Sequence, residues 1–167
     1  MALPPWTWAA GAAATAAAWF LYMKPSPHFT WGELTTTSQD EPNEPTLTQR
    51  IMLLLLAWWV LEPLRAAFGA IRVTSAYRSP AVNKGAKGAT DSHHMQGTAA
   101  DIYAIAGYTH EAMAQFIYEH SEIPVRQVIV ERHTGHLHVE LDTAGPPGKR
   151  QFLQTSDGST YTTWSPA

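Results

Sequence analysis

The sequence predicts an α+β fold in which helices pack against a small antiparallel sheet. Two stretches, Ala99–Tyr103 and His136–Asp142, alternate polar and apolar side chains with the period of two that is typical of strands. Two others, Ile51–Leu61 and Thr109–Ser121, have the length and apolar spacing of helices. Together these elements predict helices packed against the sheet.

The first half of the chain is expected to hold a connector and one buried helix. Residues 25–44 contain several prolines and acidic side chains, which favour irregular structure. The apolar run 51–61 is too short to cross a membrane and predicts a buried helix, with Thr46 or Thr48 as its cap. Pro63 is expected to interrupt this helix or to open a new turn, after which residues 64–68 are expected to continue to a stop at Gly69.

The second half is expected to supply the strands. Ala70–Ser75 predicts a strand, and Gln127–Arg132 is expected to pair with His136–Asp142 as an antiparallel hairpin. The tail after residue 145 is rich in Gly, Pro, Ser and Thr. It either forms a late strand around Gln151–Leu153 or is loose.

Length and charge limit the possible organisation. A chain of 167 residues allows one domain with a substantial core, which we place at residues 25–144, with a tail at 145–167. The net charge of −3 offers no basic surface for nucleic acid. The absence of cysteine excludes disulfides and thiolate chemistry, and it is compatible with either side of a membrane.

Residues 1–24 predict a membrane anchor or a signal-like helix. Residues 1–23 carry no charged side chain, and tryptophans and other aromatic residues flank the alanine-rich stretch from Trp6 to Met23. As a helix, residues 6–23 would extend about 27 Å, just short of a bilayer core. Its weak hydrophobicity also allows an anchor that can leave the bilayer, or a helix packed on the domain or on a partner. The orientation in the membrane stays open.

Two clusters of polar side chains predict a metal centre. His93-His94 is followed by Asp101, and His136-Leu137-His138 comes about 35 residues later on a separate predicted strand. Imidazole and carboxylate ligands suit tetrahedral zinc, and three of them leave a fourth position open for water. Structural zinc sites are usually closed by four ligands that include cysteine, so the pattern indicates a catalytic zinc.

Strand periodicity places the clustered residues on common faces. Asp101 and Tyr103 are expected to share one face of their strand. His136, His138 and Glu140 are expected to share one face of the other, with a continuous apolar face beneath them. Both histidines of the second cluster therefore face the same cavity, where Glu140 is expected to support a neighbour rather than to bind metal.

These motifs resemble the signatures of the zinc D-alanyl-D-alanine carboxypeptidase family, which is related to lysostaphin-type peptidases and to the hedgehog signalling domain. Ser92–Asp101 reads S-x-H-x-x-G-x-A-x-D and is followed by the H-x-H of residues 136–138. The similarity covers roughly residues 28–142, and its further matches are His28–Leu34, Leu61–Arg65 and Val73–Asn83. The resemblance implies an α+β domain with zinc in a groove.

The resemblance assigns roles to individual residues. It implies that His94, Asp101 and His138 are the zinc ligands. Arg78 matches an arginine that lies beside the substrate in relatives and stabilises developing negative charge. A fixed cation suits that role, because attack on an amide carbonyl creates an oxyanion. The alternative for Arg78 is to hold a turn by pairing with a carboxylate.

The general base has two candidates. Some relatives have a glutamate three residues before the last ligand, where this chain has Gly135. Others have a histidine two residues before it, and His136 fits that arrangement. Glu131, which follows the apolar run Val128–Val130, is the second candidate. In the branch that this chain most resembles, a tryptophan often occupies the position of His136, so the histidine is a departure.

The implied function is a zinc peptidase that acts on peptidoglycan peptides, encoded by a bacterium or its phage. Relatives are D-Ala-D-Ala carboxypeptidases or endopeptidases on bonds such as L-Ala-D-Glu. A membrane-anchored or exported enzyme that faces the cell wall fits the N-terminal segment. Two alternatives remain: a zinc-binding interaction module without turnover, and a passive wall-binding structural component.

Overall fold

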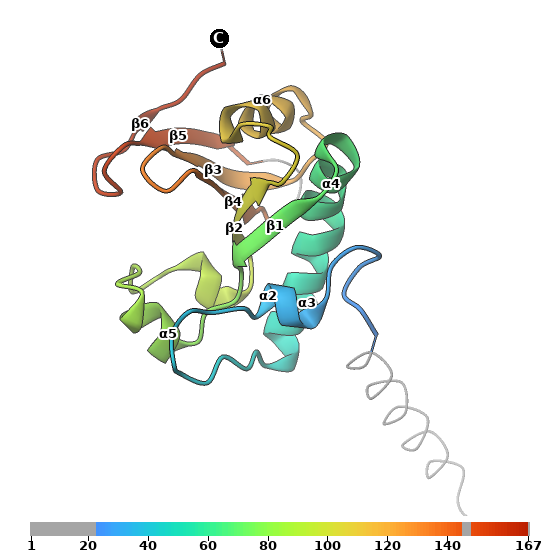
Figure 1. Ribbon diagram of the computed structural model, residues 1–167, viewed down its shortest axis with the longest axis vertical. Helices are drawn as coiled ribbons and strands as arrows, with labels where there is room; N and C mark the ends of the chain where they lie inside the picture. The colour runs from blue at the N-terminus through green and yellow to red at the C-terminus, as the bar shows by residue number, and fades with distance from the viewer. Residues whose placement is uncertain (1–22, 145–147, 167) are drawn as a thin grey trace, which may run out of the picture.

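The computed structural model describes residues 23–144 and 148–166, which form an α+β fold (Figure 1). The predicted anchor at residues 1–24 lies almost wholly outside this described part of the chain. The helical segments are α2 (Trp31–Leu34), α3 (Leu47–Leu56), the π-helical η1 (Ala57–Leu61), α4 (Glu62–Phe68), α5 (Pro80–Gly85), the 3-10 helix η2 (His93–Gln96) and α6 (His110–Glu119). The strands are β1 (Ile71–Ser75), β2 (Ala99–Ala104), β3 (Val125–Glu131), β4 (His136–Leu141), β5 (Gln151–Thr155) and β6 (Thr162–Thr163).

The strands form one sheet in the order β1-β2-β4-β3-β5-β6. The predicted hairpin is confirmed: β3 and β4 pair antiparallel, with Glu131 opposite His136. The prediction of a wholly antiparallel sheet is wrong, because β5 runs parallel to β3. The physical reason lies in the path of the chain. β4 is already paired on both edges, so the next strand adds to the free edge of β3. Because β4 ends beside the start of β3, a strand that begins at that end of the sheet runs parallel to β3.

The predicted buried helix joins the segment after Pro63 in one unbroken helix that ends at the predicted stop, Gly69. Thr46 caps it in a reciprocal arrangement with Gln49, and it continues without a break through α3, η1 and α4 to Gly69, whose φ is +71°. Pro63 does not interrupt it. Proline clashes with the carbonyl four residues earlier in an α-helix, and the π-helical turn before it changes that spacing, with the Glu62 N–H bonded to the Ala57 carbonyl five residues back.

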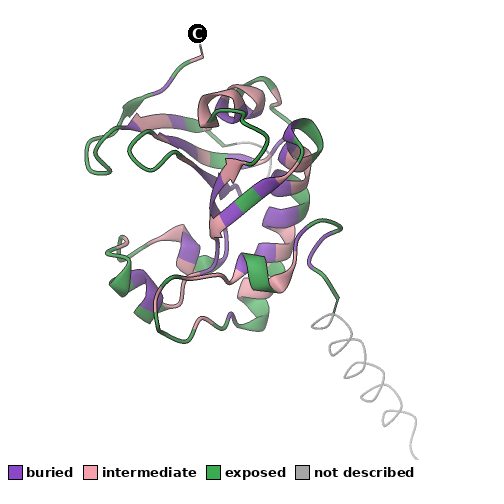
Figure 2. Cartoon of the chain, in the orientation of Figure 1, coloured by how far each residue is buried: buried purple, intermediate pink, exposed green. Residues whose placement is uncertain are grey.

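The core lies between this long helix, helix α6 and one face of the sheet. The inner face of the long helix contributes fully buried side chains such as Leu53, Leu56 and Val60. Leu137 and Val139 meet them from β4. Figure 2 shows the resulting alternation of buried and exposed positions along the helix. Successive residues of a strand point to opposite sides of the sheet. His136, His138 and Glu140 of β4 therefore point away from the core, to the side of the sheet where the candidate site lies.

Within the described residues, the helix from Leu47 to Phe68 is the one that is long and apolar enough to cross a membrane by length and composition. Its inner face forms the domain core, however, so in this fold it acts as a core helix.

Candidate metal centre and its cleft

Three side chains that can bind a metal meet where β2 and β4 pair. Asp101 and His138 are direct partners in the antiparallel register, so their side chains leave the sheet side by side. His94 comes from η2, immediately before β2. His138 Nδ1 lies 2.7 Å from Asp101 Oδ1, and His94 Nε2 lies 3.3 Å from the same oxygen. One donor atom from each residue lies within 4.8 Å of the other two.

The backbone around His94 fixes its orientation. Its Nδ1 donates a hydrogen bond to the carbonyl of Ala76 at 2.7 Å, so that Nε2 is the nitrogen that faces Asp101. Gly97 turns the chain between His94 and Asp101 with a φ of +75°. A Cβ at that position would lie 2.7 Å from the backbone oxygen of Gln49 on α3. Only glycine meets both demands without strain.

His138 is held between two carboxylates. Its Nε2 lies 3.1 Å from Glu140 Oε1, and Glu140 also forms an ion pair with Arg126. Burial alone would lower the pKa of His138, but the hydrogen bonds to Asp101 and Glu140 outweigh burial and raise it to about 10. Burial alone would raise the pKa of Asp101, but the imidazoles of His94 and His138 hold it well below its usual range. The centre therefore favours a positive charge at the position of His138.

The chemistry of this donor set fits zinc. Two imidazole nitrogens and one carboxylate oxygen form a three-ligand set that leaves a fourth position open. Each histidine directs one nitrogen at the cluster and holds the other on a carbonyl or carboxylate, at Ala76 and Glu140 respectively. Such partners orient metal-binding histidines and increase their basicity.

Arg78 lies directly beside the cluster. Its Nη2 pairs with Asp101 Oδ2 at 2.5 Å, and its Nε donates to Ser75 Oγ at 2.7 Å. Sequence analysis left open whether Arg78 pairs with a carboxylate, and the structure contains this pair. The partner is Asp101 Oδ2, whereas the two histidines contact Asp101 Oδ1. The guanidinium also lines the cleft, so it can still meet a negatively charged group there.

Both candidate bases line the same cleft, from two adjacent strands. His136 and Glu131 are register partners on β4 and β3. The His136 ring stacks on Tyr103 with a centroid separation of 5.9 Å and an interplanar angle of 7°. Glu131 Oε2 accepts a hydrogen bond from Thr134 Oγ1 at 3.0 Å. The structure therefore brings all six predicted site residues to one cleft.

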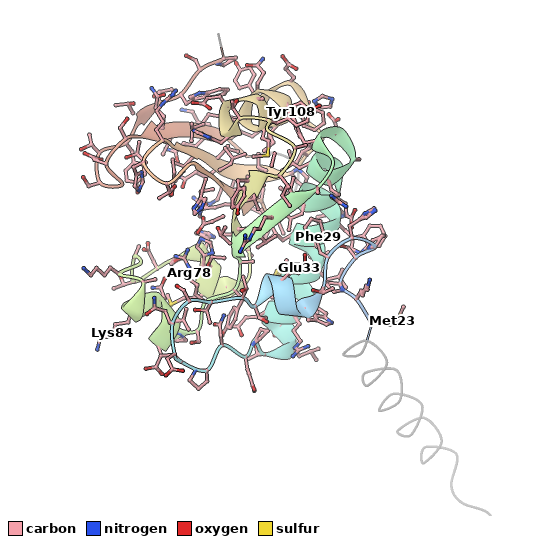
Figure 3. The ribbon with its side chains drawn as sticks, in the orientation of Figure 1. Met23, Phe29, Glu33, Arg78, Lys84 and Tyr108 are labelled. Atoms are coloured by element: carbon pink, nitrogen blue, oxygen red, sulfur yellow. The ribbon has the colours of Figure 1, made fainter. Side chains whose placement is uncertain are left out.

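The cleft has a volume of about 820 Å³ and separates the sheet from the lobe that carries α5. Figure 3 shows Arg78 at this opening, with Lys84 further out on α5. The residues that line the cleft without having been singled out by sequence analysis include Arg126 and Tyr161. Arg126 lies at an irregularity in the β3–β4 register, which breaks the alternation used to assign faces. Tyr161 comes from the tail, where no motif signalled a role.

The comparisons with known proteins agree with this geometry. A protein-family model described as Peptidase M15 matches residues 27–140, which is about two thirds of the chain. No curated protein matches the chain. The matched range contains the three clustered donors, Arg78 and both candidate bases, and we conclude that the chain belongs to the peptidase M15 family.

Proposed function

We propose that this protein is a zinc-dependent peptidase that hydrolyses bonds in peptidoglycan peptides, with His94, Asp101 and His138 as the zinc ligands. The observation that carries the proposal is the convergence of these three side chains at the floor of a cleft large enough for a short peptide. Membership of a peptidase family supports the reaction class.

Bound zinc would polarise the scissile carbonyl and lower the pKa of its water toward neutrality. The chain's own residues supply the remaining groups. Arg78 is held by Asp101 and Ser75, so its guanidinium is fixed before substrate arrives. A fixed cation beside the cluster suits an oxyanion or a substrate carboxylate, because no reorganisation is needed when the charge develops.

We assign proton transfer to His136, with Glu131 as the second candidate. The His136 ring lies on the cleft side of β4, two residues before His138, and its stacking on Tyr103 fixes its plane. Glu131 is partly engaged by Thr134. His136→Ala is expected to retain zinc while turnover falls on the order of a hundredfold. Unchanged turnover in that variant, together with a large loss in Glu131→Gln, would move the role to Glu131.

The substrate and location follow from the same proposal. A D-Ala-D-Ala carboxypeptidase and an L-Ala-D-Glu endopeptidase both fit a cleft of this size. We propose an enzyme that faces the cell wall, either exported or anchored through residues 1–24, and the absence of charged side chains from residues 1–23 supports this location.

The test is a digest of purified peptidoglycan by the zinc-loaded full chain, analysed by mass spectrometry, with His138→Ala as the control. Loss of a terminal D-Ala would identify a carboxypeptidase, and free stem peptides or split crosslinks would identify an endopeptidase. No zinc-dependent product from several wall types would contradict the proposal and favour a binding module. Tight binding to sacculi that survives zinc removal would favour a passive wall component.

A further inference from the structure

The solvent-facing side of the long helix carries a row of exposed apolar side chains between Leu47 and Trp59. Leu47 is 55% exposed, Ile51 40%, Trp58 48% and Trp59 50%. These positions recur along one side of the helix from its first turn to the π-helical segment. Isolated exposed apolar side chains are ordinary, but a continuous stripe that includes two tryptophans marks a surface that contacts something apolar.

A groove continues this stripe across to α6. It has a volume of about 760 Å³ and runs between the long helix, α6 and the end of β4. Leu55 and Trp59 line it from the helix, Phe116 from α6, and Ile123 and Leu141 from the sheet side. This groove shares no lining residue with the cleft that holds the metal centre. The surface, defined as the exposed stripe together with this groove, is called the helix face below.

The chain enters the described fold beside the start of the helix face. The indole Nε1 of Trp31 donates to the Met23 carbonyl at 2.7 Å, and the Arg50 guanidinium lies 5.1 Å from the Trp31 ring. Met23, which is 52% exposed, is thereby held near the first turns of α3. The 22 residues before it carry no charged side chain and are rich in alanine and aromatic residues.

We propose that the helix face lies on the surface of a lipid bilayer. Trp58 and Trp59 supply the amphipathic rings that favour the boundary between headgroups and hydrocarbon. The opposite side of the same helix is the domain core, so the helix can lie in the interface but cannot cross the membrane without unfolding the domain. The entry point at Met23 favours a bilayer as the occupant, because the uncharged sequence of residues 1–22 joins the fold there and, if it entered a bilayer, would hold the helix face at the membrane surface.

This placement would orient the enzyme. In Figure 3 the long helix and Met23 lie on one side of the molecule, and Arg78 and Lys84 lie on the other. With the helix face on the bilayer, the cleft opens away from the membrane. The proposal does not depend on peptidase activity, since it rests on a different surface.

Site-specific fluorescence can test the contact, because the chain has no cysteine and single-cysteine variants label cleanly. The full chain with Ile51→Cys, carrying an NBD label, is reconstituted into phosphatidylcholine vesicles that contain lipids spin-labelled near the headgroup. The matched control carries the label at Lys84→Cys, an exposed position on α5. We expect the label at position 51 to be quenched severalfold more than the label at position 84, with a blue-shifted emission.

Substitutions on the helix face sharpen the test. Adding Trp58→Gln and Trp59→Gln to the Ile51→Cys chain is expected to reduce the lipid quenching by half or more. Tyr118→Gln removes a ring of similar exposure, 48%, from α6 outside the groove lining and is expected to leave the quenching unchanged. Near-ultraviolet circular dichroism checks that the variants remain folded.

Three outcomes would overturn the proposal. The first is a chain that does not float with vesicles, and the second is equal quenching at positions 51 and 84 in floated protein. The third is a label at position 51 that is shielded from aqueous iodide yet not reached by lipid quenchers. In that case protein covers the helix face: a second copy if shielding depends on concentration, and residues 1–22 if it does not.

Discussion

His138 shows how individual side chains shape this centre. Its two nitrogens contact Asp101 and Glu140, and Glu140 is held in turn by Arg126. The ring therefore cannot rotate without breaking a hydrogen bond to a buried carboxylate. Such outer partners typically contribute ten- to a hundredfold to metal affinity.

Glu140→Gln is expected to weaken zinc binding about ten- to a hundredfold, because the amide accepts a weaker hydrogen bond from the imidazole than the carboxylate does. Competition with a fluorescent zinc chelator measures this change. Glu41→Gln, which removes an exposed carboxylate from the connector, is the control and should bind zinc as the unmodified chain does. Equal affinities in both variants would mean that Glu140 does not support His138.

The same contacts give the metal-free protein a pH-dependent stability. The pKa of His138 is raised from 6.5 to about 10, so the folded state holds this proton more tightly than the unfolded state does. That contribution is fully present below about pH 6.5 and is lost as the pH rises toward 10. We expect the melting temperature in EDTA to fall across this range, and to fall less in Glu140→Gln. A flat profile between pH 6.5 and 9 would contradict the charge arrangement.

At the scale of elements, the turn between η2 and β2 decides whether the candidate metal ligands meet. Gly97 combines a φ of +75° with close approach to α3, so the site depends on a helix that supplies no metal ligand. The side-chain amide of Gln49 on that helix donates to the Met95 carbonyl at 2.9 Å, which fixes η2 from the same side.

Gly97→Ala is expected to destabilise the fold and to impair zinc binding, because its Cβ would lie 2.7 Å from the Gln49 carbonyl oxygen. Gly107→Ala separates the two causes. Gly107 has a similar φ of +81°, but a Cβ there meets nothing within 4 Å. Strain in φ alone costs on the order of 1 kcal/mol, and we expect the loss at Gly97 to exceed that by about 1–3 kcal/mol. Urea unfolding compares the two variants, and equal losses would exclude the steric contribution.

Local patterns explain which elements sequence reasoning could predict. The hairpin around Gly135 and the shared face of His136, His138 and Glu140 follow from a period of two within a few residues. The parallel partner of β3 could not be predicted, since it depends on which sheet edge remains free. The stop at Gly69 was predicted, but the unbroken passage through Pro63 was not, because proline normally interrupts a helix and the π-helical turn that accommodates it has no strong local signal.

At the scale of the whole molecule, the C-terminal segment is an integral part of the sheet. Residues 148–166 lie outside the range that matches the family model, yet β5 pairs with β3 up to Glu131 at the cleft. Trp164 is 7% exposed and packs against Phe152 and Tyr118, with ring centroids 6.0 and 6.5 Å away. The segment therefore supports β3, the strand that carries the candidate base Glu131. Tyr161 from the same segment lines the cleft.

This arrangement predicts that the C-terminal segment and the cleft that holds the candidate metal centre unfold together. Trp164→Ala is expected to cost about 3 kcal/mol, because it removes a large buried ring. Tyr161→Ala should cost much less, since that side chain is 47% exposed. Urea unfolding gives the stabilities, and hydrogen exchange of β3 reports whether the loss spreads to the cleft. If β3 kept its protection while only β5 and β6 exchanged faster, the C-terminal segment would be an appendage and the peptidase fold would end at β4.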